Sequence, residues 1–551
     1  MSPRNAPPGY GCSVPSPSGP PGASTPHVRR VLFRACLAAV VLRLPTFLYP
    51  LVSDDEAIYS AMAQVVSHGG TMYRDTVDHK PPGLVYSYSA VASLVEHLGG
   101  SFAAVMAGVH VLGILVVALT CLALHAVARE VLEPRLAPVP PVLYALVSAA
   151  SIPPDALAVN GELMMNLPTA LAVACALVAS RSNGPKRLGL DVAAGALCGI
   201  AGLYKYQAVL VGLSFLFLLP DRRREVGKAL RTWLARGAAL GAGLVIPFAL
   251  VGAYMKSRGA LGDALQWGLL FNLHYLAEGP DFATAAHRFF MQIIGTVLPN
   301  GLIYGGGLLS VVLLVRRVAP KGASLHGIVR GRGMLVVWAA ESLFCVTLGR
   351  RYFGHYFLQP ELPLAVLAAG PVMHLWERRP RLAALGLALP SLAFFGIAAL
   401  PGTFAHLIYA GDPDYWALGR AVKSLTVPTD SIWVWGNVPQ VYFTAERRPG
   451  VRFTFCNYLT GLSPGAPSEL DPTVDSRNNA VPGAWDMVVA DLEKNRPAII
   501  VDTAAGQMKS YGKFPIDSFP VLSAYLKVHY QPEGVVLGAV LLRRTDGARG
   551  T

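Results

Sequence analysis

The sequence predicts an α-helical polytopic membrane protein that carries a soluble α/β domain at its C-terminal end. Of the 551 residues, 53% are hydrophobic and only 14% are charged, whereas soluble proteins carry about 25% charged residues. The basic residues stand in short clusters between apolar segments, as the positive-inside rule distributes them. After residue 400 the chain becomes polar, and short β-branched and aromatic runs appear.

We expect a disordered cytoplasmic tail at 1–28, because its eight prolines prevent a packed core. The apolar run after Arg30 lacks a small-residue cleavage site, which favours a retained signal anchor. The transmembrane domain is expected at 29–400 with about 11 helices. The predicted spans lie at roughly 31–50, 102–127, 138–154, 161–180, 188–203, 206–219, 233–254, 286–315, 333–348, 356–376 and 382–400.

The segment 81–98 is amphipathic, and we expect it to lie along the membrane interface. With this assignment and a cytoplasmic N-terminus, the basic clusters fall on the cytoplasmic side; counting the segment as a span would put five of them outside. We therefore place the loop 51–101 and the domain 401–551 on the outer face of the cytoplasmic membrane. This orientation predicts a multi-pass protein among membrane lipids, with no nucleic-acid partner.

The domain 401–551 is predicted to be α/β. Strands are expected at 431–436, 498–502 and 535–542, and an amphipathic helix at 484–495. The seven cysteines form no CxxC or Cys/His pattern, so the sequence supports neither a disulfide framework nor a zinc site.

The outer loop from Ser53 to Gly83 concentrates charge in a charge-poor chain, which makes it the candidate catalytic site. Carboxylates at a membrane face are costly unless they meet a metal, a substrate or a counter-charge. Asp55 is interpreted as a general base or metal ligand, or alternatively as the N-cap of a helix that begins there. The residues that carry this interpretation are Asp54, Asp55, Glu56, Asp75, Asp78, His79 and Lys80.

Lys80 beside these carboxylates suits a phosphate leaving group, because its ammonium is a compact point charge. The alternative is that Pro81 and Pro82 stiffen the loop while Lys80 neutralises its acids. Two arginines, Arg350 and Arg351, stand on the outer side against the charge bias and invite a lipid phosphate, or else snorkel to headgroups.

Lys205 has the same two interpretations as this arginine pair. Glu162 is either a helix-start acid or a ligand, and His355 follows the arginine pair on the same outer side. All of these residues fall at the outer ends of predicted spans. We therefore expect the fold to gather them around one outward-facing cavity.

Several motifs together resemble those of bacterial membrane glycosyltransferases with the GT-C fold. This group is related to the protein O-mannosyltransferases (dolichyl-phosphate-mannose-protein mannosyltransferases) and the lipid A aminoarabinose transferases. The resemblance covers about residues 30–510. The motifs that carry it are DE-x-x-Y, then GG-x-x-YRD-x-x-D-x-KPP, NGELMMNLP, GLYKYQA, GRRYFGHYFLQPELP and DLEKNRPAIIVD.

The resemblance implies transfer of a sugar from a polyprenyl-phosphate donor to a glycan, lipid or protein acceptor, with a divalent Mg²⁺ or Mn²⁺ ion possible. The second acid stands as D-H-K where lipid A transferases have E-K-P-P. The implied residues are Asp55, Asp78 and Glu56 for catalysis, Asp55 and Asp78 for metal, Lys80, Arg350, Arg351 and Lys205 for the donor phosphate, and Tyr59, Tyr73, Glu162 and His355 for substrate.

Two other classes of protein fit the same composition. A transporter or flippase for a lipid-linked substrate also needs many spans and polar residues at depth. It predicts paired halves with matching interrupted segments, which the sequence does not show, and it leaves the C-terminal domain without a role. A catalytically inactive, lipid-binding relative of the same fold is the other alternative, although the acidic loop is intact.

Overall fold

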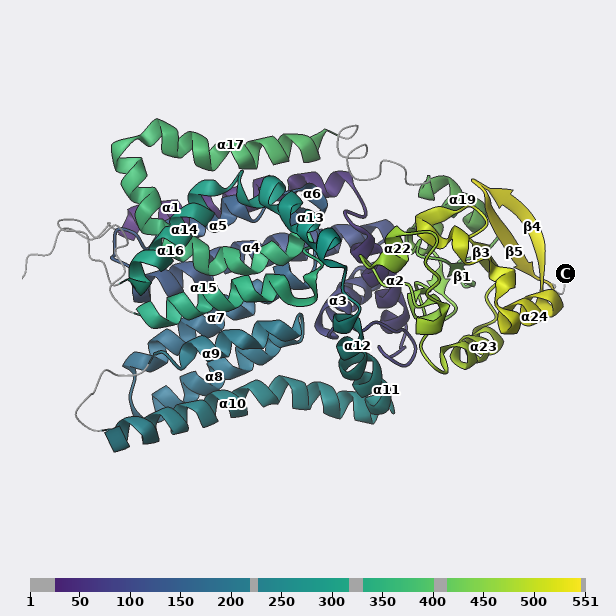
Figure 1. Cartoon of the computed structure of the whole chain (residues 1–551), viewed down its shortest axis with the longest axis horizontal. Coiled ribbons are helices and arrows are strands. Elements are labelled where there is room, and N and C mark those ends of the chain that lie inside the picture. Colours follow the sequence, from purple (N-terminus) through teal and green to yellow (C-terminus); the bar gives the residue numbers. More distant parts are fainter. Residues whose placement is uncertain (1–24, 219–225, 317–330, 401–413, 547–551) are drawn as a thin grey trace, which may run out of the picture.

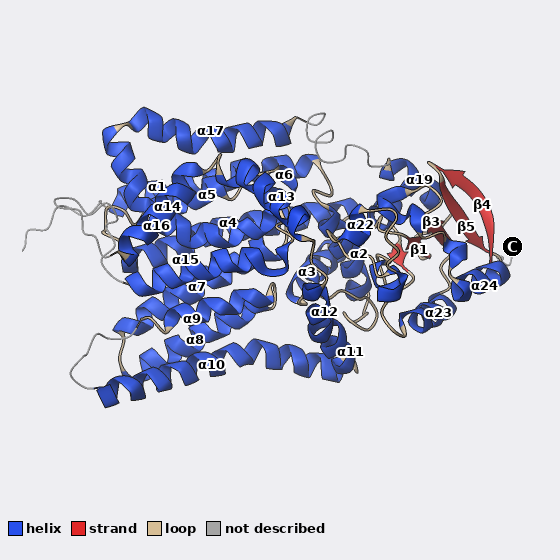
Figure 2. Cartoon of the chain, viewed as in Figure 1, coloured by secondary structure: helices blue, strands red, loops and turns tan. Residues whose placement is uncertain are grey.

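The computed structural model describes residues 25–218, 226–316, 331–400 and 414–546. A bundle of helices and a smaller α/β domain lie end to end, and the long helices of the bundle run side by side toward the α/β domain (Figure 1). All strands belong to the C-terminal domain (Figure 2). The predicted tail at 1–28 lies outside the described residues except at its end, where α1 already begins at Thr25.

The helices of the bundle follow the predicted spans along the chain. The connecting segments carry shorter helices that approach the C-terminal domain (Figure 1). The bounds are α1 Thr25–Arg43, α2 Asp54–Ser67, α3 Gly83–His97, α4 Phe102–Val131, α5 Val139–Val147, α6 Pro153–Leu157, α7 Gly161–Arg181, α8 Gly184–Gly202, α9 Val211–Phe215, α10 Val226–Ser257, α11 Leu261–Leu265, α12 Phe271–Ala277, α13 Phe282–Gln292, α14 Gly301–Val315, α15 Arg332–Thr347, α16 Leu358–Arg378 and α17 Pro380–Ala399.

The predicted number of 11 spans is not confirmed. Within the described residues, six helices are long and apolar enough to cross a membrane, or up to seven if the pair Phe282–Val297 and Gly301–Val315, bent by 105°, forms one span. The helix α16 shows why the two counts differ. It carries Gln359 and Glu361 and is buried among α5, α14 and α15. A helix shielded by other helices tolerates polar residues that lipid would reject.

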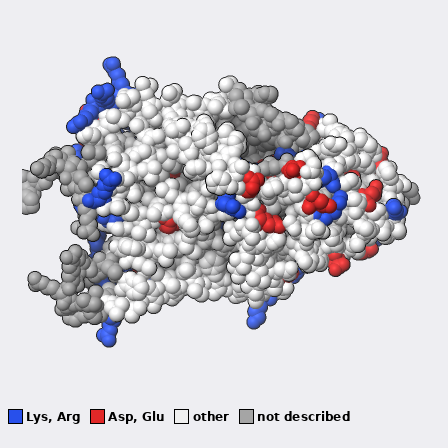
Figure 3. Space-filling view, viewed as in Figure 1, with Lys and Arg blue, Asp and Glu red and all other residues white. Residues whose placement is uncertain are grey.

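Charge is distributed unevenly along the molecule. Figure 3 shows Lys and Arg at the end of the bundle that points away from the C-terminal domain. Most of the Asp and Glu visible in that view lie on the C-terminal domain and at its junction with the bundle. Part of the predicted basic loops, at 219–225 and 317–330, lies outside the described residues.

The segment predicted to lie along the interface forms α3, which is not among the apolar helices suited to span a membrane. It packs against α2 and α4. Together α2, α3 and the turn between them form a cap on the bundle, next to the C-terminal domain (Figure 1). The outer loop of the sequence prediction is therefore an ordered helical hairpin.

The C-terminal domain is built on a five-stranded sheet with the order β2-β1-β3-β5-β4. Strand β1 (Ser431–Trp435) pairs in parallel with β2 (Arg448–Pro449) and β3 (Ile499–Asp502). The other two strands, β4 (Tyr530–Val536) and β5 (Ala539–Arg544), are antiparallel. The helices are α19 Tyr415–Ser424, α20 Gln440–Ala445, α21 Asn457–Thr460, α22 Pro467–Leu470, α23 Ala484–Asn495 and α24 Pro520–His529.

One strand prediction is wrong in detail. The run 535–542 is not a single strand, because the chain reverses at Leu537 and Gly538 to form the β4–β5 hairpin. Both residues have positive φ, 53° and 83°. A two-residue turn with positive φ at both positions matches the right-handed twist of the strands that it joins. The uninterrupted apolar run hid the turn from the sequence analysis.

Candidate active site

Three acids, Asp54, Asp55 and Glu56, lie in the first turn of α2. Ser53 is the N-cap, and its Oγ accepts a hydrogen bond from the Glu56 amide at 3.3 Å. The cap alternative for Asp55 is therefore wrong, because the preceding serine fills that position. Acids in the first turn also lie favourably at the positive end of the helix dipole. The Asp55 side chain remains available for other contacts.

Asp55, Tyr59 and Lys80 form a compact charged group. Lys80 Nζ lies 3.0 Å from Asp55 Oδ1 and donates to the Tyr59 hydroxyl at 2.6 Å. The side chains of Asp55 and Lys80 are 30% and 21% exposed, so a substrate can reach them. Burial acts to raise the pKa of Asp55, but Lys80, His355 and Lys205 outweigh it and lower that pKa. The carboxylate is therefore ionised at neutral pH.

The ammonium of Lys80 stays charged because the acidic groups around it stabilise its positive charge. Burial opposes its charge, but Asp55, Tyr59 and Asp78 raise the pKa of Lys80 well above its usual value. A lysine ammonium has three N–H donors. Two of them go to Asp55 and Tyr59. The group thus combines a carboxylate, a phenol and a cation with one donor in reserve.

Two further charged pairs lie near this group. Lys205 Nζ lies 2.8 Å from Glu162 Oε1, and His355 Nδ1 lies 3.5 Å from Asp155 Oδ1. Glu162 is in the first turn of α7, whose N-cap is Asn160. The helix-start interpretation and the ligand interpretation of Glu162 are thus compatible, since its carboxylate also binds a lysine. The sequence analysis did not identify Asp155, the partner of His355.

Glu56 lies next to Asp55 in sequence but points into the protein. Its side chain is fully buried, and its two oxygens accept hydrogen bonds from the amides of Val52 at 2.7 Å and Val159 at 2.8 Å. His110 Nε2 lies 3.4 Å away. Glu56 therefore joins the start of α2 to the segment before α7. These contacts make it a positioning residue for Asp55, and its predicted catalytic role stays untested.

Asp78 is also buried, at 1% exposure, and precedes Lys80 by two residues in the loop. Its Oδ1 accepts from the His79 amide at 2.7 Å and lies 3.0 Å from His79 Nδ1. The Tyr458 hydroxyl accepts from the same amide at 3.0 Å and donates to Asp78 Oδ1 at 3.4 Å. Despite burial, Lys80 and His79 lower the pKa of Asp78. This carboxylate fixes the shape of the loop.

The C-terminal domain holds the outer loop at further points. The Val77 amide donates to the Arg452 carbonyl at 2.9 Å. Asp54 accepts from Gln440 Nε2 and lies 3.2 Å from Lys509 Nζ. None of these partners has a local sequence signal, because they lie more than 370 residues further along the chain.

Tyr73 supports Lys80 from within the loop. It is 2% exposed, and its hydroxyl donates to the Lys80 carbonyl at 2.9 Å. Its φ is 74°, in the left-handed region that costs non-glycine residues energy. Since this hydroxyl already serves the loop backbone, Tyr73 lies behind Lys80 in the structure. Its predicted contact with substrate stays untested.

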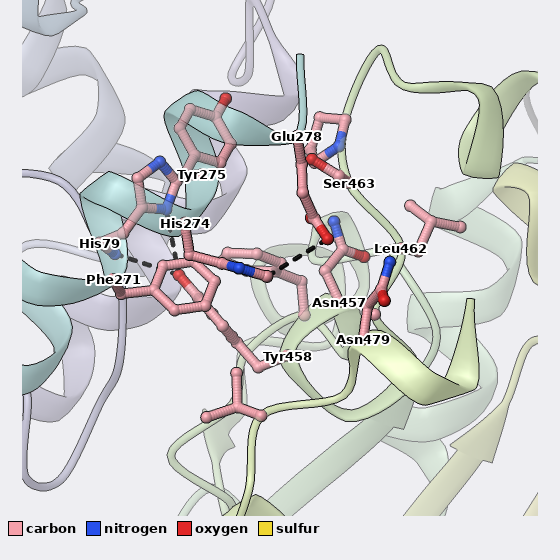
Figure 4. A pocket seen from close by; sticks show the side chains of 14 residues that line it. His79, Phe271, His274, Tyr275, Glu278, Asn457, Tyr458, Leu462, Ser463 and Asn479 are labelled. Atoms are coloured by element: carbon pink, nitrogen blue, oxygen red, sulfur yellow. Dashed lines mark hydrogen bonds and ion pairs between the residues drawn. The ribbon is translucent and has the colours of Figure 1, made fainter. Parts of the chain in front are cut away.

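A pocket partly lined by His79 lies between α12 and the C-terminal domain (Figure 4). The His79 ring stacks against Tyr275 with ring centres 4.1 Å apart, and its backbone and ring both contact Tyr458. Figure 4 shows Asn457 and Asn479 of the C-terminal domain on the side facing α12. The polar lining is supplied by His79, His274, Glu278, Asn457, Ser463 and Asn479.

The two arginines differ in position. Arg351 is 1% exposed and stacks on Tyr275, with its guanidinium carbon 3.6 Å from the ring centre. It donates to the carbonyls of Tyr275, Glu278 and Pro464. These contacts join α12 to the C-terminal domain and leave no exposed face for a phosphate, so the position of Arg351 argues against its predicted role. Arg350 is exposed and remains accessible to an anion.

Each of the two expected metal ligands is paired with a basic side chain. Asp55 is paired with Lys80, and Asp78 with His79. Among the described residues no group of three or more His, Cys, Asp and Glu side chains is arranged to hold a metal ion. The residues present therefore do not form a site that fits Mg²⁺ or Mn²⁺ in this conformation. The dependence on a divalent ion stays a prediction.

Comparison with known proteins agrees with the motifs. The family model for dolichyl-phosphate-mannose-protein mannosyltransferases matches residues 79–251, which begin within the outer loop and end in α10. No curated protein matches the sequence. The strongest evidence on architecture therefore comes from solved structures.

The structure of ArnT from Cupriavidus metallidurans bound to undecaprenyl phosphate matches with a TM-score of 0.58 and 14% identity, over 95% of this chain and 99% of that one. Its apo state gives 0.57 and 16%, over 96% and 100%. The archaeal oligosaccharyltransferase AglB from Archaeoglobus fulgidus, in complex with an inhibitory peptide and a dolichol-phosphate, gives 0.51 and 15%, over 95% and 74%. At this identity the likeness defines the architecture: the chain has the GT-C fold.

Proposed function

We propose that this protein is a membrane glycosyltransferase that takes a sugar from a polyprenyl-phosphate donor. The observation that carries the proposal is the partly exposed group of Asp55, Tyr59 and Lys80 at the end of a helical bundle. The partial family match and the GT-C fold support it. A sugar on a lipid phosphate is already activated, so the site needs a cation and a base but no nucleotide-binding loop.

In the proposed reaction, an acceptor hydroxyl oxygen attacks the anomeric carbon of the donor sugar. The bond between that carbon and the phosphate oxygen breaks, and polyprenyl phosphate leaves with the bonding electrons. Asp55 accepts the proton of the acceptor, a role worth typically about 10²–10⁴-fold in rate. The remaining N–H of Lys80 donates to the leaving phosphate, with Lys205 and Arg350 as further candidate cations.

Lys80 also links donor binding to the strength of the base. In the described structure it lowers the pKa of Asp55, which makes that carboxylate a weak proton acceptor. A donor phosphate competes with Asp55 for the same ammonium. We infer that donor binding raises the pKa of Asp55 and so activates it as a base when both substrates are present.

The site is proposed to lie on the outer face of the cytoplasmic membrane. The basic residues at the opposite end of the bundle support this orientation, because positive loops stay on the cytoplasmic side (Figure 3). The pocket beside His79, between α12 and the C-terminal domain, then lies on the same outer side.

The test is turnover by the purified full-length protein on polyprenyl-phosphate sugars that differ in the sugar, with Mg²⁺ or Mn²⁺ present and again after EDTA. Wild-type protein should release free polyprenyl phosphate as the sugar passes to an added glycan hydroxyl or to water, and Asp55→Asn should not, while still binding donor. Near-wild-type turnover by Asp55→Asn would overturn the role of Asp55. Absence of donor binding by the wild-type protein would overturn the proposed function, and unchanged turnover after EDTA would remove the metal.

A further inference from the structure

A second cavity, of about 580 Å³, lies in the C-terminal domain. This volume falls within the range of roughly 300–1,000 Å³ that is usual for small-molecule sites. Two of its walls are the β4–β5 hairpin and α24, which lie at the end of the molecule farthest from the bundle (Figure 1). The cavity is therefore separate from the Asp55–Lys80 group.

The sheet register gives this cavity an apolar floor with one carboxylate at its edge. Asp502 is opposite Val540 in the β3–β5 pair, so the two side chains point to the same face. Leu542 is two residues beyond Val540, and Pro532 of β4 is opposite Leu542. All four residues line the cavity. One face of the sheet thus supplies three apolar side chains next to an acid.

Asp502 lies at the carboxyl end of β3, the strand that runs parallel to β1. From β3 the chain leads to the β5 side of the sheet. The cavity is lined by residues of β3, β4 and β5 and of the segment that follows β3. Asp502 therefore stands where the sheet meets that segment.

The contacts of Asp502 leave half of its carboxylate for a ligand. The residue is 6% exposed, and its Oδ1 accepts hydrogen bonds from the amides of Ala504 at 3.0 Å and Ala505 at 3.4 Å. Within the described residues Oδ2 accepts no hydrogen bond, and no lysine or arginine forms an ion pair with the carboxylate. Burial raises the pKa of Asp502 to about 6, which agrees with a carboxylate that lacks a partner.

We propose that this cavity binds a sugar residue of an uncharged glycan. Two carboxylates, Asp502 and Asp517, outnumber the one cation in the lining, Lys527, so the cavity disfavours phosphates and other anions. A sugar ring offers hydroxyl donors to Asp502 Oδ2 and acceptors to Lys527 and Gln507 on the cavity wall. Its C–H face fits the apolar floor. The proposal goes beyond the transfer reaction, because it gives the C-terminal domain a glycan-binding site of its own.

The experiment is saturation-transfer NMR on the full-length protein in lipid nanodiscs, since glycoside detergents would compete for the site. The probes are the methyl glycosides of mannose, galactose and arabinose and their disaccharides. At least one should bind, and Asp502→Asn should weaken its binding at least tenfold. Asn keeps an oxygen for the two amides, so the fold is retained. Lys527→Ala, an exposed position, should weaken binding by about threefold.

Two controls keep this result separate from the proposed transfer reaction. Glu493→Gln removes an exposed acid of the same domain outside the cavity and should leave binding unchanged. Asp55→Asn should bind the same sugars as the wild-type protein, whether or not the chain proves to be a transferase. The proposal is overturned if no probe binds, or if Asp502→Asn binds like the wild-type protein.

Discussion

The outer loop contains two charged pairs that differ in exposure, and they are called here its exposed end and its buried end. At the exposed end, the partly exposed Asp55 and Lys80 face each other across 3.0 Å. At the buried end, Asp78 and His79 are enclosed by Tyr458 of the C-terminal domain. A carboxylate that contacts a flexible ammonium can exchange its partner for a substrate. One that accepts from backbone amides holds the chain in place.

The largest effect on the exposed end is expected from Lys80→Met. The substitution keeps the length of the side chain but removes the charge that, in the proposed reaction, stabilises the leaving phosphate. Turnover should fall about 10²–10³-fold, as for the loss of one preorganised donor. Release of polyprenyl phosphate under saturating donor is the measurement. The matched control is Lys494→Met, whose side chain is 71% exposed and 3.8 Å from Asp75; an equal loss there would refute the specific role of Lys80.

A second variant separates the two adjacent acids of α2. Glu56→Gln places an NH₂ group against one of two backbone N–H donors, at Val52 or Val159, and leaves that donor buried without a partner. We expect the protein to lose about 2 kcal/mol of stability. The comparison is thermal unfolding of Glu56→Gln beside Asp55→Asn, which should unfold near the wild-type temperature. Equal stability of both variants would contradict the assignment of Glu56 to positioning.

Tyr458→Phe tests the buried end and is expected to have a smaller effect. The ring contacts remain, but the hydroxyl that bridges the His79 amide and Asp78 is lost. A neutral hydrogen bond contributes about 0.5–1.5 kcal/mol, so turnover should fall about three- to tenfold through misplacement of Lys80. Affinity for the acceptor and turnover should be measured separately. A loss of acceptor affinity alone would instead make Tyr458 a substrate contact.

The smallest effect is expected from pH across the neutral range. The folded pKa values of Asp55 and Asp78 are lowered. Their contribution to stability is therefore complete well above the unfolded value of about 3.9, and it disappears as pH falls toward the folded values. The contribution of these two residues to stability, and kcat/KM for the donor, should stay level from pH 8 to about pH 5. If donor phosphate draws Lys80 away, the acid limb of kcat should lie at higher pH than that of kcat/KM; coincident limbs would exclude that competition.

Sequence alone identified the parts of the site that are close together along the chain. The spacing of Asp55, Tyr59 and Lys80 within one outer loop sufficed to place them in one hypothesis. It did not find Tyr458 or Asp155, because single polar residues distant in sequence carry no pattern. The contacts of Arg351 were not foreseen for the same reason, since a carbonyl-bonded arginine and a phosphate-binding arginine look alike in sequence.

The fold predictions likewise succeeded for features set by local sequence and failed for features set by packing. Helix positions followed from hydropathy, which is local. The number of spans did not, because α16 is shielded by neighbouring helices whose arrangement the sequence does not state. The β4–β5 turn was missed because Leu537 and Gly538 interrupt no apolar pattern.

The bridge between Tyr458 and His79 also sets the order in which this protein can be completed. The two residues are 379 positions apart. At a synthesis rate of about 5–20 residues per second, the ribosome needs roughly 20–80 s to travel from one to the other. During that interval the outer loop has emerged without the domain that fixes it. The candidate site therefore matures last, after most of the helices have been made, and a nascent chain gains the geometry of its outer loop only when the C-terminal domain docks.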